Sequence, residues 1–141
     1  MIQLGAAMLC DAASVRENLI HVLGGGITQL GRSNYPAPLG CDLALTFYVP
    51  YEEGRSGLHV AAFCPNPESD GHLFGFEATI NMQVDSSVGP QSASLVVPFA
   101  GMGIPAPGRY SIEVVADGSV IGSVPFTAVI VDVPEMPSAS A

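Results

Sequence analysis

The stretch Leu73–Asp85, LFGFEATINMQVD, has the clearest periodic pattern in this chain of 141 residues. Its even positions are all apolar, whereas the odd positions from 77 onward carry Glu, Thr, Asn, Gln and Asp. A period of two is typical of a strand with one face in a core and the other in water. A helix would spread the same apolar side chains around its circumference. The pattern therefore predicts a long strand of an antiparallel sheet, against which the rest of the chain pairs or stacks.

Shorter stretches with the same alternation lie on both sides of this strand. They predict strands at residues 43–49, 58–64, 95–99, 110–116, 119–126 and 128–132. Asp117-Gly118 separates two of these runs and predicts a hairpin with a type I′ turn. Pro98 has no N–H group to donate, so the strand that contains it is expected at a sheet edge or at a bulge.

The N-terminal part reads differently. Residues 2–10 are apolar on both faces, which predicts a strand inside a sheet. Residues 11–14 are expected to form a turn and residues 15–18 a solvent-facing connection. The next strand, 18–23, has Leu19 and His21 on one face. Three glycines at 24–26 then predict a bend, after which the chain is expected to switch sheets, because glycine adopts positive φ without steric cost.

About eight or nine short strands, with turn signals roughly every ten residues, predict an all-β fold. We expect an antiparallel β-sandwich that is immunoglobulin-like in outline only, because the chain has no Trp and hence no Cys…Trp…Cys signature. Residues 1–132 are predicted to form one domain, and residues 133–141, VPEMPSASA, a flexible C-terminal tail.

The charge balance argues against two classes of partner. Four arginines, no lysine and 13 acidic residues give a formal net charge of −9. Nucleic acids and anionic membranes require clustered cations, so neither is an expected partner. The sequence has no apolar run long enough for a membrane span and no basic-flanked leader, so we expect a cytoplasmic protein or one assembled into a virion there. Arginine without lysine, beside abundant Ala, Gly and Pro, suggests a GC-rich bacterial or phage genome.

Residues that could carry chemistry do not converge in the sequence. The three cysteines, Cys10, Cys41 and Cys64, form no CxxC pair and are expected to be free and buried. The three histidines, His21, His59 and His72, have no ligand partner at i+2 or i+4. We therefore predict no catalytic, cofactor-binding or metal-binding residues and no enzymatic activity. The alternative is a thiol site in which Cys10 or Cys41 meets a histidine, although burial beside Asp11 or Asp42 would raise the thiol pKa.

Two further motifs favour structural roles. The glycines at 24–26 are followed by Ile27-Thr28-Gln29 rather than by Gly-Lys-Ser/Thr and a helix, so they do not predict a phosphate loop. Glu52 and Glu53 lie in a predicted turn and are expected to be solvated.

Aromatic and proline residues in loops or on outer strand faces indicate a possible protein-contact patch. Its members are Tyr35, Pro36, Pro38, Tyr48, Tyr51 and Phe63. The alternative is that these residues are scattered and only cover the ends of the sandwich.

The stretch from Met8 to Leu30, MLCDAASVRENLIHVLGGGITQL, resembles the opening of a family of small uncharacterised bacterial domains, found mainly in actinobacteria. Members are similar in reading "LCD", a Val-Arg-Glu-type turn and a "hVlGGGhT" strand, and in a closing Pro-Gly-Arg-Tyr followed by Asp-Gly and Pro-Phe, here residues 107–126. The resemblance implies a β-sandwich and no established activity or site.

The sequence favours a non-enzymatic protein-interaction or accessory domain with an unidentified protein partner. The alternative is a structural or decoration subunit of a larger assembly, such as a phage virion. Edge strands of a sandwich can pair between chains, so a homo-oligomer is compatible with either function.

Overall fold

The computed structural model describes residues 1–82 and 89–132, and all regular structure in these ranges is strand. The strands are β1 (Gln3–Cys10), β2 (Ala12–Arg16), β3 (Leu19–Leu23), β4 (Gln29–Arg32), β5 (Ala37–Pro38), β6 (Asp42–Val49), β7 (Gly57–Pro65), β8 (His72–Asn81), β9 (Gln91–Val97), β10 (Gly103–Ile104), β11 (Gly108–Ala116) and β12 (Ser119–Ile130). The all-β class is confirmed. Twelve strands replace the predicted eight or nine, partly because β5 and β10 are only two residues long.

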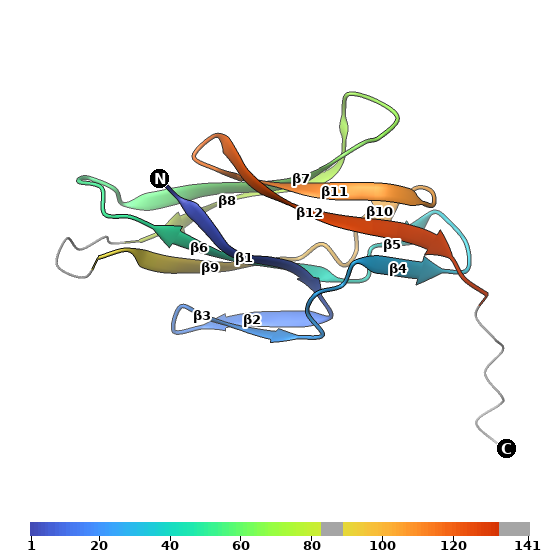
Figure 1. Ribbon diagram of the computed structural model, residues 1–141, viewed down its shortest axis with the longest axis horizontal. Helices are drawn as coiled ribbons and strands as arrows, with labels where there is room; N and C mark the ends of the chain where they lie inside the picture. Colours follow the sequence, from blue (N-terminus) through green and yellow to red (C-terminus); the bar gives the residue numbers. More distant parts are fainter. Residues whose placement is uncertain (83–88, 133–141) are drawn as a thin grey trace, which may run out of the picture.

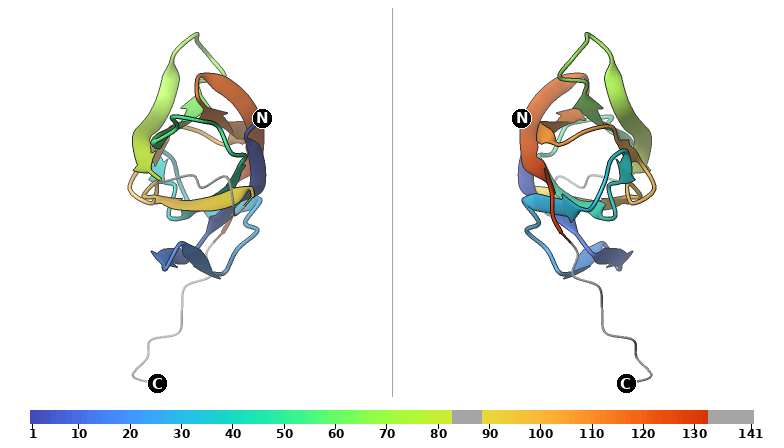
Figure 2. Two further views of the ribbon diagram at one scale, coloured as in Figure 1. Left: turned by 90° about the vertical axis from the view of Figure 1, so that its left-hand side faces the viewer. Right: turned by 90° about the vertical axis from the view of Figure 1, so that its right-hand side faces the viewer.

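Two main sheets enclose one core. The first has the order β1-β6-β9 and the second the order β4-β12-β11-β7-β8, while β2-β3 and β5-β10 are separate two-stranded ladders (Figure 1). The five-stranded sheet curls, so in the end-on views of Figure 2 the strands surround a common interior. Buried side chains from both sheets form a single cluster there. Phe74 and Phe99 meet edge to face in it, with ring centroids 4.8 Å apart.

The stretch that shows the clearest alternation forms β8, and its alternation is confirmed over the described residues. Its even positions are less exposed than its odd ones, but only Phe74 is buried, whereas Phe76 and Ile80 are half-buried. Within the described ranges β8 lies at the edge of the five-stranded sheet and pairs only with β7, so the prediction that the chain is organised around it is wrong. Strands with neighbours on both edges, such as β6 and β7, bury their inner faces more completely. Residues 83–85 of the stretch lie outside the described residues.

The prediction that residues 2–10 lie inside a sheet is also wrong, because β1 is an edge strand. Its last two residues, Leu9 and Cys10, are buried, and its first half is partly exposed. Other elements approach its side chains. A Cβ at Gly122 of β12 would meet the Leu4 side chain at 2.7 Å, and one at Gly25 would meet Met8 at 2.6 Å. These neighbours explain why β1 is apolar without being central.

Residues 11–14 do not form the predicted turn. Ala12–Arg16 is strand β2, which pairs with β3, and the turn consists of Glu17 and Asn18, with φ of 53° and 61°. The predicted bend at the three glycines is confirmed, since Gly24 and Gly26 have positive φ. The chain then changes sheets as predicted. β4 joins the five-stranded sheet in parallel with β12, whereas β1 belongs to the other sheet, so the prediction of purely antiparallel pairing is wrong for this pair of strands.

The predicted hairpin around Asp117-Gly118 is confirmed, with both residues at positive φ between β11 and β12. The two strands predicted at 119–126 and 128–132 form one continuous strand, β12. β9 lies at a sheet edge and ends at Val97, directly before Pro98, as the missing N–H group predicts. The predicted tail, 133–141, lies outside the described residues. The described part of the chain contains no helix long and apolar enough to cross a membrane.

Candidate functional site

The six residues of the predicted contact patch lie in three places. Tyr48 ends the solvent-facing side of β6 and Tyr51 follows in the next loop, and the exposed fractions of the two residues are 50% and 46%. Tyr35, Pro36 and Pro38 lie before the start of β6, so the length of that strand separates them from Tyr48. Phe63 belongs to β7, in the other main sheet. The structure brings Tyr48 near Tyr51 and does not join the six into one surface.

Two of these tyrosines make contacts within the chain. The Tyr35 side chain is half-buried, and its hydroxyl donates to the carbonyl oxygen of Val129 at 2.8 Å. The Tyr48 ring covers Gly5 of the neighbouring strand, where a Cβ would lie 2.7 Å from Tyr48 Cε2. Both contacts join strands within the chain, and neither involves a second protein.

The three cysteines are free and buried, as predicted. Burial raises the pKa of Cys41 and of Cys64 to about 11. Burial also raises the pKa of Cys10, and the nearby carboxylates of Asp42 and Asp11 add to this shift. All three thiols are therefore protonated at neutral pH, which disfavours nucleophilic chemistry.

The histidines are exposed on different elements. His21 lies on β3, whereas His59 and His72 lie on β7 and β8. Among residues 1–82 and 89–132, no three His, Cys, Asp or Glu side chains are grouped closely enough to hold a metal ion. The three glycines at 24–26 form a bend at the base of the β2–β3 hairpin.

The β2–β3 hairpin is the most unusual element of the fold. It lies outside the three-stranded sheet, below β6 and β9 in Figure 1, and contacts these two strands. None of its residues belongs to the buried cluster. Its inner face carries Ala13, Val15, Ile20 and Val22, which pair across the two strands. An isolated two-stranded hairpin is at best marginally stable in water, so this one depends on its contacts with the sheet.

The outer face of the hairpin carries two exposed leucines on either side of His21, and Ser14 and Arg16 share this face. Leu19 and Leu23 have exposed fractions of 61% and 71%, among the largest for apolar side chains of the described residues. Both alternate with the half-buried Ile20 and Val22, so their exposure follows directly from the pleat. Arg16 pairs with Leu19 across the strands and therefore shares this face. We name Arg16, Leu19 and Leu23 the hairpin face.

The tip of the hairpin is tied to the sheet by polar contacts. The Asn18 amide nitrogen donates to the carbonyl oxygen of Ser92, and the Ser94 hydroxyl donates to the carbonyl oxygen of Asn18 at 3.5 Å. At the base, the backbone amides of Gly26 and Ile27 donate to the carbonyl oxygen of Leu9 in β1, at 3.0 and 3.1 Å. The hairpin is therefore held at both ends while its hairpin face remains in solvent.

A second apolar surface lies on the outer face of the five-stranded sheet. A groove of ≈ 630 Å³ there is lined by residues of four strands. We name this groove the sheet groove. Its apolar floor consists of Phe63, Val115 and Val120, and Val120 is 58% exposed. The Phe63 ring lies 4.3 Å from the His72 ring, centroid to centroid. Glu77 lines the groove, and Glu113 pairs with Phe63 on the same face.

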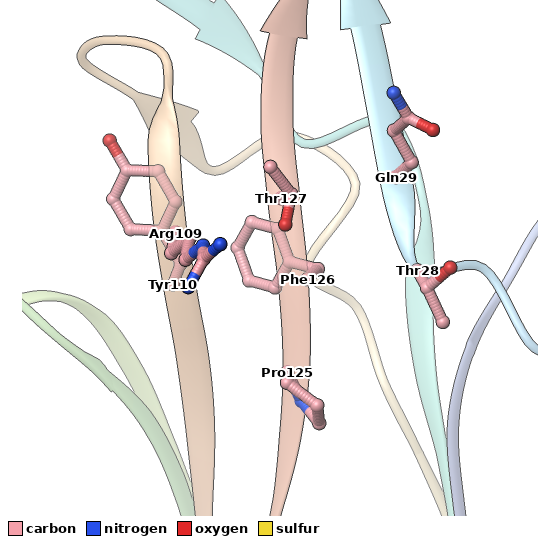
Figure 3. Close-up of a pocket in the computed structure, with 7 residues that line it drawn as sticks. All are labelled: Thr28, Gln29, Arg109, Tyr110, Pro125, Phe126 and Thr127. Carbon is pink, nitrogen blue, oxygen red and sulfur yellow. The ribbon is translucent and has the colours of Figure 1, made fainter.

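A more polar groove of ≈ 480 Å³ runs over β4, β12 and β11 (Figure 3). Gln29, Thr127 and Arg109 occupy one register across the three strands, and Pro125 and Thr28 also line it. Arg109 is exposed, and in the part of the chain that the structure describes no carboxylate lies within ion-pair distance of it. This groove has little apolar surface, and the Arg109 guanidinium is the cation that it offers to a ligand.

The hairpin face and the sheet groove were not predicted as a site. The sequence does place Leu19 and His21 on one face of a strand, but it predicts a turn at residues 11–14, where the structure has strand β2. The strand has apolar residues on both faces, Leu19 and Leu23 on one and Ile20 and Val22 on the other. This pattern is the signal in the sequence that both faces could make contacts. Of the residues that line the groove, Phe63 was singled out as a contact residue and His59 and His72 only as candidate metal ligands, because the floor is assembled from strands that are distant in sequence.

Comparison with known proteins adds a family without assigning a role. A sequence model for a family described as a family of unknown function matches residues 5–129. No curated protein matches the chain. The match covers both main sheets and the hairpin.

Proposed function

This chain belongs to the family of unknown function DUF6941, and we propose that it is a non-enzymatic protein-binding domain whose hairpin face contacts a protein partner. The observation that carries this proposal is the exposure of Leu19 and Leu23 on an element outside the core. Covering apolar surface contributes about 25 cal/mol per Å², so two largely exposed leucines beside an arginine favour a protein contact.

The arrangement of the hairpin supports the same function. Its base and tip are bonded to the sheet, so the hairpin face is held in one orientation and little conformational freedom is lost on binding. The buried, protonated cysteines and the separated histidines offer no support for a thiol enzyme.

A role as a subunit of a larger assembly is the second candidate. The sheet groove favours it, because a second apolar surface on the opposite sheet gives one chain two places to contact neighbours. As part of this second candidate we propose an immunoglobulin-like β-sandwich outline, which the two facing sheets support. We also propose a bacterial or phage origin and assembly in a cytoplasm, which the composition supports.

The test is affinity purification of the tagged chain from the organism that encodes it. A Leu19→Ser/Leu23→Ser variant is compared with the wild type and with Ile130→Ser, a matched control at an exposed apolar position on β12. We expect the wild type and the control, but not the double variant, to recover a stoichiometric protein partner. That partner is either a different protein or an untagged copy of this chain. Recovery of the same protein by all three, or by none, would contradict the proposal.

A further inference from the structure

We propose that the partner of the hairpin face is a second copy of this chain, and that Leu19 and Leu23 of one copy dock into the sheet groove of the next. This inference rests on the proposed function, since it uses the hairpin as the binding surface. It goes further by naming the occupant and the surface that receives it.

The sheet groove has the chemistry to receive two leucines. Val115 pairs with Val120 on one side and with Ala61 on the other, so their side chains form a continuous apolar row across three strands. Phe63 lies beside this row, and its cross-strand partner is Gly75, which has no side chain to fill the space above it. The floor is thus apolar and half-buried to exposed, and the volume of ≈ 630 Å³ admits side chains from another molecule.

The charges of the two surfaces are complementary. Arg16 lies on the hairpin face, while Glu77 and Glu113 lie on the face of the sheet groove. Among the residues that the structure describes, the ion pairs are those of Arg55 with Glu52 and Asp117, so Arg16, Glu77 and Glu113 have no ion-pair partner within that part of the chain. At a net charge of −9, most contacts between copies are repulsive. A contact that brings an arginine to a pair of carboxylates is favoured over the others.

The two surfaces cannot meet within one chain. The hairpin packs outside β6 and β9, whereas the groove lies on the outer face of β7, β8, β11 and β12. Figures 1 and 2 show these elements on opposite sides of the molecule. Docking must therefore join different copies through two unlike surfaces, and such a heterologous contact produces closed rings or open filaments rather than an isolated dimer.

The experiment measures mass in solution by light scattering after size exclusion, from about 10 μM to about 1 mM chain. The wild type is expected to exceed the 14.5 kDa of one chain as the concentration rises. Leu23→Asp disrupts the hairpin face and Val120→Asp disrupts the sheet groove. Each substitution is expected to weaken association more than about tenfold. Ile130→Asp, exposed and outside both surfaces, is the matched control and is expected to assemble as the wild type does. Circular dichroism establishes that each variant keeps its strands.

Mixing the two defective variants provides the decisive measurement. Leu23→Asp retains its groove and Val120→Asp retains its hairpin face, so a one-to-one mixture is expected to form a complex of two chains and no larger species. Two monomers in the mixture would overturn the inference, as would a wild type that stays monomeric throughout. In the latter case, loss of a host protein from the Leu19→Ser/Leu23→Ser variant would leave the proposed function standing.

A charge exchange tests the same contact at Arg16 and Glu77, which are exposed and lie outside the buried cluster. Arg16→Glu is expected to weaken association, and adding Glu77→Arg in the same chain is expected to restore at least part of it. Association that is unchanged by Arg16→Glu, or not restored by the exchange, would overturn the pairing of these two surfaces.

Discussion

The hydroxyl of Tyr35 donates a hydrogen bond of 2.8 Å to the carbonyl oxygen of Val129, 94 residues later in the chain. Val129 pairs with Gly31 where β12 and β4 run parallel, and the same hydroxyl oxygen lies 3.4 Å from the carbonyl oxygen of Leu30. Tyr35 therefore fastens the connection that leaves β4 to the last strand of the fold. Its aromatic ring had suggested a contact surface, yet its polar end is bonded within the chain.

Tyr35→Phe is expected to lower the free energy of unfolding by about 1 kcal/mol, because it removes one part-buried hydrogen bond and keeps the ring. Urea unfolding would show this as a lower midpoint with an unchanged slope. Tyr51→Phe, at an exposed loop position, is the control and should leave the midpoint unchanged. Equal midpoints for the two variants would contradict the role assigned to Tyr35.

Asn18→Gly removes the side-chain hydrogen bond that joins the turn of the β2–β3 hairpin to Ser92 of β9. Glycine accepts the positive φ of 61° at this position, but it cannot donate to the carbonyl oxygen of Ser92. Amide hydrogen exchange is expected to accelerate in residues 12–23, while exchange in β6 and β7 stays as in the wild type. Uniform acceleration across all strands would mean that the hairpin unfolds with the core.

Gly118→Ala is expected to destabilise the fold by about 1 kcal/mol, since φ at this position is +82° and a Cβ disfavours that region. Nothing lies within 4 Å of the added Cβ, so the cost comes from the backbone alone. Gly101→Ala is the matched control, because it also faces open space and has no positive φ. Thermal unfolding of both variants would measure the difference.

Stability is expected to fall as the pH rises from about 9 to about 11. The ordinary thiol pKa is 9.0, and burial raises it to about 11 for Cys41 and Cys64. Between these values the unfolded chain loses thiol protons that the folded chain keeps, so the contribution is complete below pH 9 and is lost above it. Each thiol accounts for on the order of 2 kcal/mol.

The measurement is urea unfolding under reducing conditions at several pH values. Cys64→Ala should show a smaller loss of stability over this pH range than the wild type, whatever its stability at pH 7. Burial also raises the pKa of Tyr110, and the Cys64 thiolate adds to this shift, so the difference between the two proteins reports the thiol together with its coupling to Tyr110. Identical pH dependence would contradict the assignment.

Local patterns predicted most of the individual strands. The alternation of β6, β7 and β11 follows from the pleat, because each has one face in the core. Asp117-Gly118 predicted its turn because few residue pairs adopt two successive positive φ values at low cost. The turn at Glu17-Asn18 falls within the connection expected at residues 15–18, but its two-residue form was not predicted, since glutamate rarely adopts this conformation.

The sequence by itself determined the all-β class, the burial of the cysteines and the change of sheet at the three glycines, since these follow from side-chain alternation, polarity and glycine φ. Only the tertiary structure decided that the strand with the clearest alternation is an edge strand, because pairing partners come from distant parts of the chain and leave no mark on the strand itself. The same holds for the sheet groove, whose floor joins Phe63 to Val115 and Val120 across three strands. The exposure of Leu19 and Leu23 likewise depends on which face of the hairpin the three-stranded sheet covers.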